Sequence, residues 1–262
     1  MIPIAMRRQT LRTKRRYLEV GLISFLIFAF LNSPVMTAKS GFNMALAATQ
    51  QTAGPEGDQN EQKVNDPYEH LNRQFFDFND RLYFDVLKPA AQVYSACLPA
   101  DVREALRNGF HNMVSPGRFV NFALQAKGDK AANEVTRFVI NSTMGMAGLI
   151  DLAQARFALQ NHESDFGQTL ALWGVGSGPF MIIPVLGPSN PRDLFGFAVD
   201  SAMDPLIWIP ADWWVTFCPE TARYVNRVSL QIGQYEELKK ASLDPYIAMR
   251  DAYIQYRAHL LE

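Results

Sequence analysis

The helical spacing of apolar residues constrains the fold most, since it begins near Asn65 and continues almost to the C-terminus. Asp66 and Pro67 predict the start of a first helix, because aspartate is a good N-cap and proline fits the first helical position. Large apolar residues then recur every three or four positions, at Tyr68, Leu71, Phe75, Phe78, Leu82 and Val86. This stripe predicts a helix with a buried or membrane-facing side.

Comparable helix starts recur further along the chain. Ser115-Pro116, Asp129, Pro219 and Asp244-Pro245 each precede a run of apolar residues at helical spacing. Strand-like alternation of apolar and polar residues is scarce. The sequence therefore predicts an all-α domain without a substantial sheet.

Two apolar segments interrupt the helical pattern. Residues 174–193 (GVGSGPFMIIPVLGPSNPRD) contain too many glycines and prolines for a long regular helix. Residues 206–217 (LIWIPADWWVTF) hold three of the four tryptophans, Trp208, Trp213 and Trp214. Tryptophan favours places where one edge of the ring is apolar and the other is wet, including membrane interfaces. An ordinary hairpin within the core explains the second segment equally well.

The N-terminus has the pattern of a secretory signal peptide. Six basic residues and no acid occur among the first sixteen positions, and residues 20–31 form an uncharged apolar run. That run is shorter than the roughly 20 residues a spanning helix needs. The best cleavage match is Ala45-Leu46-Ala47, which predicts a signal peptide over residues 1–47. The alternative is an N-terminal anchor that is not cleaved.

Residues 48–64 are polar, rich in glutamine and almost free of large apolar groups. They cannot bury enough surface to offset the entropy of ordering, so we expect a flexible linker. Residues 65–262 have the length and the apolar content of a single folded domain.

Charge excludes one class of partner. Of the 25 Lys and Arg residues, seven precede Ser40, against one of the 26 Asp and Glu residues, so the rest carries a net charge near −7. Binding to nucleic acid requires a basic face, and we expect none here. Affinity for a membrane would have to come from apolar burial.

Cysteine and histidine spacing offers little chemistry. Cys97 and Cys218 are the only cysteines, and an oxidising periplasm would allow one disulfide between them. Two buried free thiols are the alternative. The four histidines lack ligand spacing, so no metal site is expected. His162-Glu163 and the glycines around Ser177 do not complete a metalloprotease, nucleophile-elbow or phosphate-loop motif, so neither an enzyme nor a cofactor is predicted.

A set of motifs spread along the chain resembles the MlaA/VacJ family. The matching stretches are residues 65–73 with Phe75, Phe76, Phe78 and Asn79, residues 133–143 with Gly145, Gly148 and Asp151, residues 165–170 and 173–179, Ile183-Pro184, Gly187-Pro188, Arg192-Asp193, and residues 244–246 and 250–253. They occur in the family's order and span nearly the whole domain.

The resemblance implies a flat ring of amphipathic helices with a central channel, set in the inner leaflet of the bacterial outer membrane. Such a protein passes phospholipid misplaced in the outer leaflet to a soluble periplasmic carrier, and thereby maintains lipid asymmetry. Family members associate with trimeric porins and perform no covalent chemistry. A soluble periplasmic lipid carrier and a porin-binding structural adaptor are the alternative functions.

Two segments are candidates for function in such a ring. We expect the segment from Gly174 to Pro188 to line or border the lipid path, because its glycines allow close backbone approach. The candidate residues are Gly174, Gly176, Gly178, Pro179, Phe180, Met181 and Ile183. We expect Trp208, Trp213 and Trp214 in a gating or membrane-dipping hairpin.

The sequence departs from the family at the membrane anchor. Family members are usually lipoproteins with a cysteine at the signal cleavage site, and no cysteine precedes Cys97. We therefore expect a protein at the periplasmic face of the outer membrane that is not acylated at its N-terminus. The helices, an uncleaved N-terminus or a porin would then hold it at the membrane.

Overall fold

The computed structural model describes residues 66–208 and 213–261, with the side chains of residues 207 and 213–218 excepted. The predicted signal peptide and linker therefore lie outside the described residues. Within them the chain is mostly helical, which confirms the predicted fold class. The elements in order are α3 (Glu69–Leu82), the π-helical turn η2 (Tyr83–Leu87), α4 (Lys88–Cys97), α5 (Ala100–Met113), α6 (Ser115–Leu124), α7 (Gly128–Thr143), α8 (Leu152–Phe157), α9 (Phe166–Leu172), β1 (Met181–Ile183), β2 (Gly187–Ser189), α10 (Pro191–Met203), the 3-10 turn η3 (Pro205–Trp208), α11 (Trp213–Leu230), α12 (Gln234–Ala241) and α13 (Pro245–His259).

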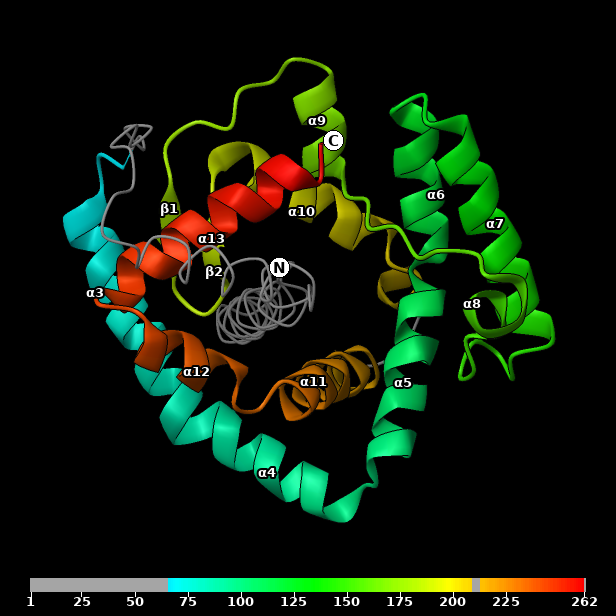
Figure 1. The fold of residues 1–262 in the computed structure, drawn as a ribbon, viewed down its shortest axis with the longest axis horizontal. Helices are drawn as coiled ribbons and strands as arrows, with labels where there is room; N and C mark the ends of the chain where they lie inside the picture. The colour runs from blue at the N-terminus through cyan, green and yellow to red at the C-terminus, as the bar shows by residue number, and fades with distance from the viewer. Residues whose placement is uncertain (1–65, 209–212, 262) are drawn as a thin grey trace, which may run out of the picture.

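The helices surround a centre instead of stacking in layers (Figure 1). From α3 through α4 the chain follows one side of the ring, and α5 continues around it. The antiparallel pair α6 and α7 and the packed pair α9 and α10 complete the circuit. Helix α11 then packs against α4 and α5, and α13 returns across the β-hairpin. The ring expected from the family resemblance is thus present.

Side-chain caps fix where several helices begin. The side chains of Asp165, Asn190 and Asp244 accept hydrogen bonds from the first backbone N–H groups of α9, α10 and α13. Two predicted starts are wrong. Tyr68 precedes α3, because the Asp66 carboxylate binds Tyr246 and Asn72 instead. Pro219 lies inside α11, which begins six residues earlier.

The hairpin formed by β1 and β2 is held by the first helix. It is the one sheet among the described residues, with Ile182 opposite Pro188 in an antiparallel pair. Asn72 accepts a hydrogen bond of 2.8 Å from the N–H of Ile182, and Asn79, two turns on, accepts one of 2.6 Å from Val185. The two amides occupy one face of α3 and bind backbone N–H groups of the strand β1 and of the hairpin turn, which would otherwise lack partners.

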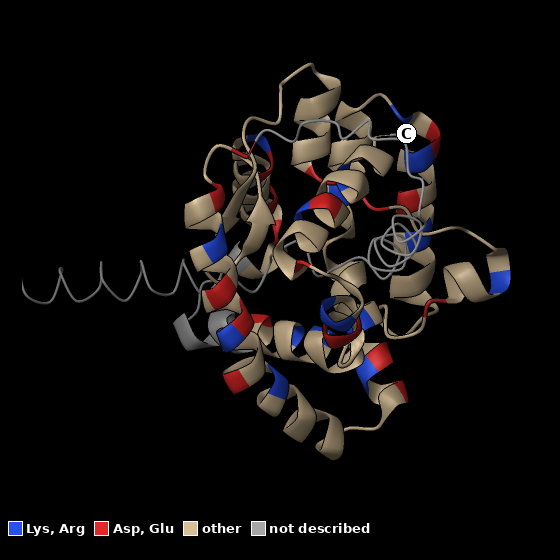
Figure 2. Ribbon diagram, turned by 60° about the vertical axis from the view of Figure 1, so that its left-hand side comes forward, with Lys and Arg blue, Asp and Glu red and all other residues tan. Residues whose placement is uncertain are grey.

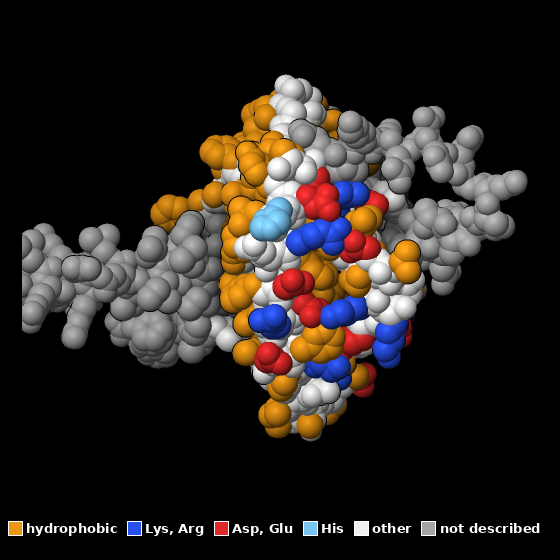
Figure 3. Space-filling model, turned by 90° about the vertical axis from the view of Figure 1, so that its left-hand side faces the viewer, with side chains coloured by type: hydrophobic (Ala, Val, Ile, Leu, Met, Phe, Trp, Pro, Cys, Tyr) orange, Lys and Arg blue, Asp and Glu red, His pale blue; other side chains and the backbone are white. Residues whose placement is uncertain are grey.

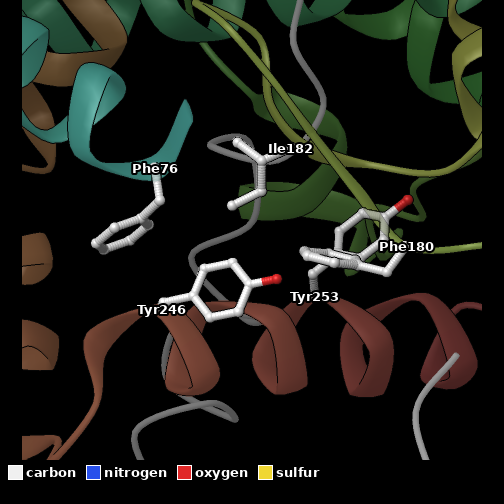
Figure 4. Close-up of a cluster of buried hydrophobic side chains, with 5 residues drawn as sticks. All are labelled: Phe76, Phe180, Ile182, Tyr246 and Tyr253. Atoms are coloured by element: carbon white, nitrogen blue, oxygen red, sulfur yellow. The ribbon is translucent and has the colours of Figure 1, made fainter. Parts of the chain in front are cut away.

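One hydrophobic cluster joins the first helix, the hairpin and the last helix. Tyr246 and Tyr253 project from α13 toward Phe76, Phe180 and Ile182 (Figure 4). The rings of Phe76 and Tyr246 meet edge to face at 6.0 Å between centroids. Because the cluster brings the first and last helices of the domain together over the hairpin, its burial closes the ring.

A second cluster fastens α11 to the opposite side. Tyr83, Ala91, Tyr224 and Val228 are buried together, and Tyr235 packs edge-on against Tyr83 with 4.9 Å between centroids. Tyr83 lies in η2, so the widened turn places its ring against α11. The core is thus divided between two clusters on the ring instead of filling its centre.

The outer surface carries many large apolar side chains. Val139, Met144 and Met146 are more than half exposed around the end of α7, and so are Trp173 and Phe195 around α9 and α10. On the face seen in Figure 3, hydrophobic side chains gather along one edge while charged ones occupy the middle. In the described part of the chain, every helix is too short or too polar to cross a membrane.

Candidate functional site

A cavity of about 580 Å³ lies among α5, α6, α9, α10, α11 and α13. Most of the residues that line it are polar or charged. Seven carboxylates line it, from Glu104, Asp151, Glu163, Asp165, Asp193, Asp200 and Asp204, together with five guanidiniums, from Arg107, Arg118, Arg223, Arg227 and Arg257. Figure 2 shows acidic and basic residues side by side along several helices, so neither sign forms a continuous block.

Arg257 of α13 binds the carboxylates of two other elements. Its Nη2 donates to Asp165 at 3.1 Å and to Asp193 at 3.0 Å. Tyr253, one turn earlier on α13, donates a hydrogen bond of 2.6 Å to Asp193. Burial alone would raise the pKa of Asp193, but Arg257 and these donors lower it below its usual value. The carboxylate therefore stays charged and ties α13 to α10.

Further ion pairs hold the opposite wall. Arg118 is buried against Glu134, with 2.9 Å between Nε and Oε1, and its Nη2 lies 3.2 Å from His111. His111 in turn pairs with Glu163. Burial would raise the pKa of Glu163, but His111 together with the charges of Arg118 and Arg227 keeps it below its usual value. Pairing of this kind is what allows so many charges to remain in a partly buried wall.

Asp200 differs from the other carboxylates of the wall. One oxygen accepts a hydrogen bond of 2.8 Å from Asn121, and the other accepts one of 2.9 Å from the N–H of Phe166. Burial, followed by the charge of neighbouring Asp165, raises the pKa of Asp200 to about 7. The cavity therefore contains a carboxyl group that titrates near neutral pH.

The seven predicted lipid-path residues lie elsewhere. None of them lines this cavity. Gly174, Gly176 and Gly178 are exposed in the loop after α9, while Phe180 is buried against α13. Their part in a lipid path stays a prediction. Positive φ angles at Gly174 and Gly178, +88° and +76°, give these two glycines a conformational role in the loop.

The tryptophan segment is described only in part. Trp208 is 73% exposed, and its indole N–H donates a hydrogen bond of 2.8 Å to the carbonyl of Ala202. Trp213 and Trp214 open α11, but their side chains lie outside the described residues. Of this segment, the structure shows the 3-10 turn η3, which ends at Trp208, and the first residues of α11, which begins at Trp213. The gating or membrane-dipping hairpin stays a prediction.

Cys97 is exposed at the end of α4. The side chain of Cys218 lies outside the described residues, so the disulfide between them stays a prediction. Among the described residues, His, Cys, Asp and Glu form no group of three or more that could hold a metal ion.

Sequence reasoning missed the charged residues of the cavity wall. Asp165, Asp193 and Arg257 are separated by up to 92 positions, and only the fold brings them together. The sequence does contain a feature that could have indicated Asp200, because this acid directly follows the apolar run of α10. A lone acid at the end of such a run indicates a polar environment that the rest of the helix does not share.

These features define the class of the protein: a helical ring with an apolar exterior and a charged internal cavity. Residues 64–260 match the family described as MlaA lipoprotein. The chain therefore belongs to the MlaA lipoprotein family.

Individual relatives agree with this assignment. The chain is 32% identical over 198 residues to the intermembrane phospholipid transport system lipoprotein MlaA of Haemophilus influenzae, covering 73% of this chain and 77% of that protein. The protein of the same name from Escherichia coli K12 is also 32% identical over 198 residues, covering 74% and 78%. An uncharacterized protein of Rickettsia bellii is 36% identical over 198 residues, covering 74% and 76%.

A solved structure has the same fold. It concerns the structural basis for maintenance of bacterial outer membrane lipid asymmetry, and it superposes with a TM-score of 0.66 at 30% sequence identity. The match covers 75% of this chain and 99% of that one. The prediction that the N-terminus lacks acylation is not supported, because the matching family and both named relatives are described as lipoproteins.

Proposed function

We propose that this protein removes mislocalised phospholipid from the outer leaflet of the bacterial outer membrane and passes it to a soluble periplasmic carrier. The ring would lie at the periplasmic face of that membrane, in its inner leaflet, next to a trimeric porin. The names of the relatives support phospholipid transport, and the solved structure supports a role in outer-membrane lipid asymmetry. No step of this role requires covalent chemistry.

The observation that carries the proposal is the contrast between the two surfaces of the ring. Large apolar side chains such as Met144, Met146 and Phe195 face outward, while charged groups line the cavity inside. A phospholipid has the same two parts, since its acyl chains favour apolar contact and its headgroup requires hydrogen bonds or charge. A ring with this distribution can rest among acyl chains and admit a headgroup.

Helices suit this position because their backbone hydrogen bonds are internal. Apolar burial also provides membrane affinity for a chain whose net charge gains little from anionic lipid. Within this proposal, the loop from Gly174 to Pro179 borders the path to the cavity, and the segment holding Trp208 gates it or dips into the leaflet. Both assignments follow from the family resemblance and from the exposure of these residues.

Deletion of the gene tests the function. The amount of phospholipid in the outer leaflet, measured by an enzyme that acts only on surface-exposed lipid, should rise in the deletion strain and fall again when the full chain is restored. An unchanged amount would contradict transport and favour a porin-binding adaptor. Recovery of the protein in a periplasmic wash, without detergent, would favour a soluble carrier.

A further inference from the structure

One carboxylate of the cavity wall differs from the others in lacking a basic side-chain partner. Six of the seven have a basic side-chain partner, and only Asp200 has none among the residues that the structure describes. The pairs are Glu104 with Arg107, Asp151 with Arg137, Glu163 with His111, Asp165 with Arg257, Asp193 with Arg192 and Arg257, and Asp204 with Arg223.

The guanidiniums of the wall are engaged as well. Arg257 and Arg223 bind the aspartates named above, and Arg118 binds Glu134. Arg227 lies within the fields of Glu220 and Glu163, which favour its charged form against the effect of burial. A phosphate entering the cavity therefore meets cations that already have counter-ions, whereas a cation meets Asp200, which has no basic side chain bound directly to it among the described residues.

Asp200 also keeps the capacity to bind a further donor. Each of its oxygens accepts one hydrogen bond, from Asn121 and from the N–H of Phe166. A carboxylate has about four lone-pair sites, so both oxygens remain able to accept another proton donor.

The next residue supplies a second, independent observation. The hydroxyl of Ser201 is buried, with 7% of the residue exposed, and lacks a hydrogen-bond partner among the described residues. Ser201 lines the same cavity as Asp200. A buried hydroxyl without a partner is costly, which is consistent with a ligand that completes it. Asn226 on α11 also lines the cavity, and its side-chain carbonyl oxygen is buried without a hydrogen-bond partner among the described residues.

We propose that Asp200 and Ser201 bind the primary ammonium group of a zwitterionic phospholipid headgroup, so that the cavity selects ethanolamine-type lipids over purely anionic ones. An ammonium group offers three proton donors and one positive charge. Asp200 in its ionised form supplies the charge and an acceptor, and the Ser201 hydroxyl supplies a second acceptor from the adjacent residue. The inference rests on the proposed function and assigns the headgroup that the function leaves open.

Lipid competition tests the assignment. Full-length protein in detergent is offered equal amounts of phosphatidylethanolamine and phosphatidylglycerol, and the bound lipids are counted by native mass spectrometry. We expect the ethanolamine lipid to be favoured by about fivefold, the effect of one partly buried ion pair. Asp200→Asn should abolish this preference. Asp77→Asn, which removes an exposed carboxylate outside the cavity, is the matched control and should keep it.

A second variant separates an effect on lipid binding from an effect on folding. Asparagine at position 200 would lose one acceptor for the two donors that Asp200 binds, so Asp200→Asn is expected to be less stable. Ser201→Ala removes a hydroxyl without a partner, and it should fold as well as wild type while reducing the preference by about twofold.

The outcomes separate the two levels of the proposal. Equal binding of the two lipids to wild type, or an unchanged ratio in both variants, would overturn the ammonium site alone. Binding of neither lipid to folded wild type would contradict the proposed function itself. A final measurement adds ethanolamine without lipid, and saturable binding of it as tight as that of the lipid would assign the site to soluble amines instead.

Discussion

The phenol of Tyr246 on α13 donates a hydrogen bond to Oδ2 of Asp66, 180 residues earlier in the sequence. Asp66 also accepts from Asn72, and Arg250 lies 3.5 Å from the same oxygen. The first described residue and the last helix are therefore joined directly, beside the aromatic cluster of Figure 4. This contact closes the ring, because it lies where the two ends of the domain meet.

Loss of this bond should loosen the closure. Tyr246→Phe keeps the ring of Tyr246 in the cluster and removes only the hydroxyl, so we expect the free energy of unfolding to fall by about 1.5–3 kcal/mol, the range for a hydrogen bond to a charged group. Tyr68→Phe removes the hydroxyl of a tyrosine that is half exposed, and it should change little. Chemical denaturation of both variants measures the difference, and equal stabilities would contradict the role of the bond in closure.

The close approach of α9 and α10 gives a second prediction. A Cβ atom on Gly196 would lie 2.3 Å from the backbone nitrogen of Gly167, which is closer than real side chains come. Gly196→Ala should therefore separate the two helices and lower the free energy of unfolding by about 1–3 kcal/mol or more.

Gly128→Ala is the control for that change. Nothing lies within 4 Å of a Cβ at Gly128, the first residue of α7. The substitution should leave the melting temperature unchanged or raise it slightly, because alanine favours helix by roughly 0.5–1 kcal/mol over glycine. If Gly196→Ala melted at the wild-type temperature, the contact between the two helices would be looser than the structure has it.

The carboxyl of Asp200 predicts a pH dependence of stability. Its pKa in the folded protein is about 7, above the ordinary value of 3.8, because of burial and Asp165, which the neighbouring charge of Arg257 only partly opposes. Between these values the folded state binds a proton that the unfolded state releases. The resulting stabilisation is complete below pH ~4 and is lost as the pH rises through ~7.

Asp200→Asn isolates this contribution, because asparagine does not titrate. As the pH rises from about 5 to about 8, the unfolding free energy of wild type should fall relative to that of the variant. Parallel pH profiles of the two proteins would show that Asp200 stays ionised throughout, and would place its pKa at the ordinary value.

The glycine loop after α9 permits a direct test of the lipid path. Gly176 is exposed, and a Cβ at this position would meet nothing within 4 Å. Gly176→Trp should therefore fold normally, and it should impair lipid asymmetry if the loop borders the path. Detergent sensitivity of a strain that expresses the variant at wild-type level measures the effect, and wild-type resistance would remove the loop from the path. Gly178→Trp is less informative, because the positive φ of Gly178 strains any side chain.

The thiol of Cys97 gives the last prediction. Because it is exposed at the end of α4, it should react with a maleimide without denaturant. Mass spectrometry of protein extracted from outer membranes in the absence of reductant provides the measurement. Failure to react, together with the mass lost on forming one S–S bond, would show instead that Cys97 and Cys218 are bridged.

The sequence by itself determined the local structure. Apolar residues at helical spacing predict helices because 3.6 residues complete a turn. Ser115-Pro116 and Asp244-Pro245 mark real starts, since proline fits the first turn of both helices and the Asp244 side chain caps α13. The family resemblance added the ring. Asp66 and Pro219 misled for different reasons. The carboxylate of Asp66 binds Tyr246, a residue far along the chain, and α11 begins at Trp213, so that Pro219 lies inside the helix.

The tertiary structure alone decided the interior. Asp165, Asp193 and Asp200 become a cavity wall only because α9, α10 and α13 pack together, and Arg257 binds two of these aspartates from 92 and 64 residues away. The periodicity of the sequence does not predict such a pairing, since a charged residue on a helix face gives the same sequence pattern whether its side chain contacts water or a partner. The charge state of Asp200 depends in the same way on its burial and on the distant Asp165, which only the folded ring brings beside it.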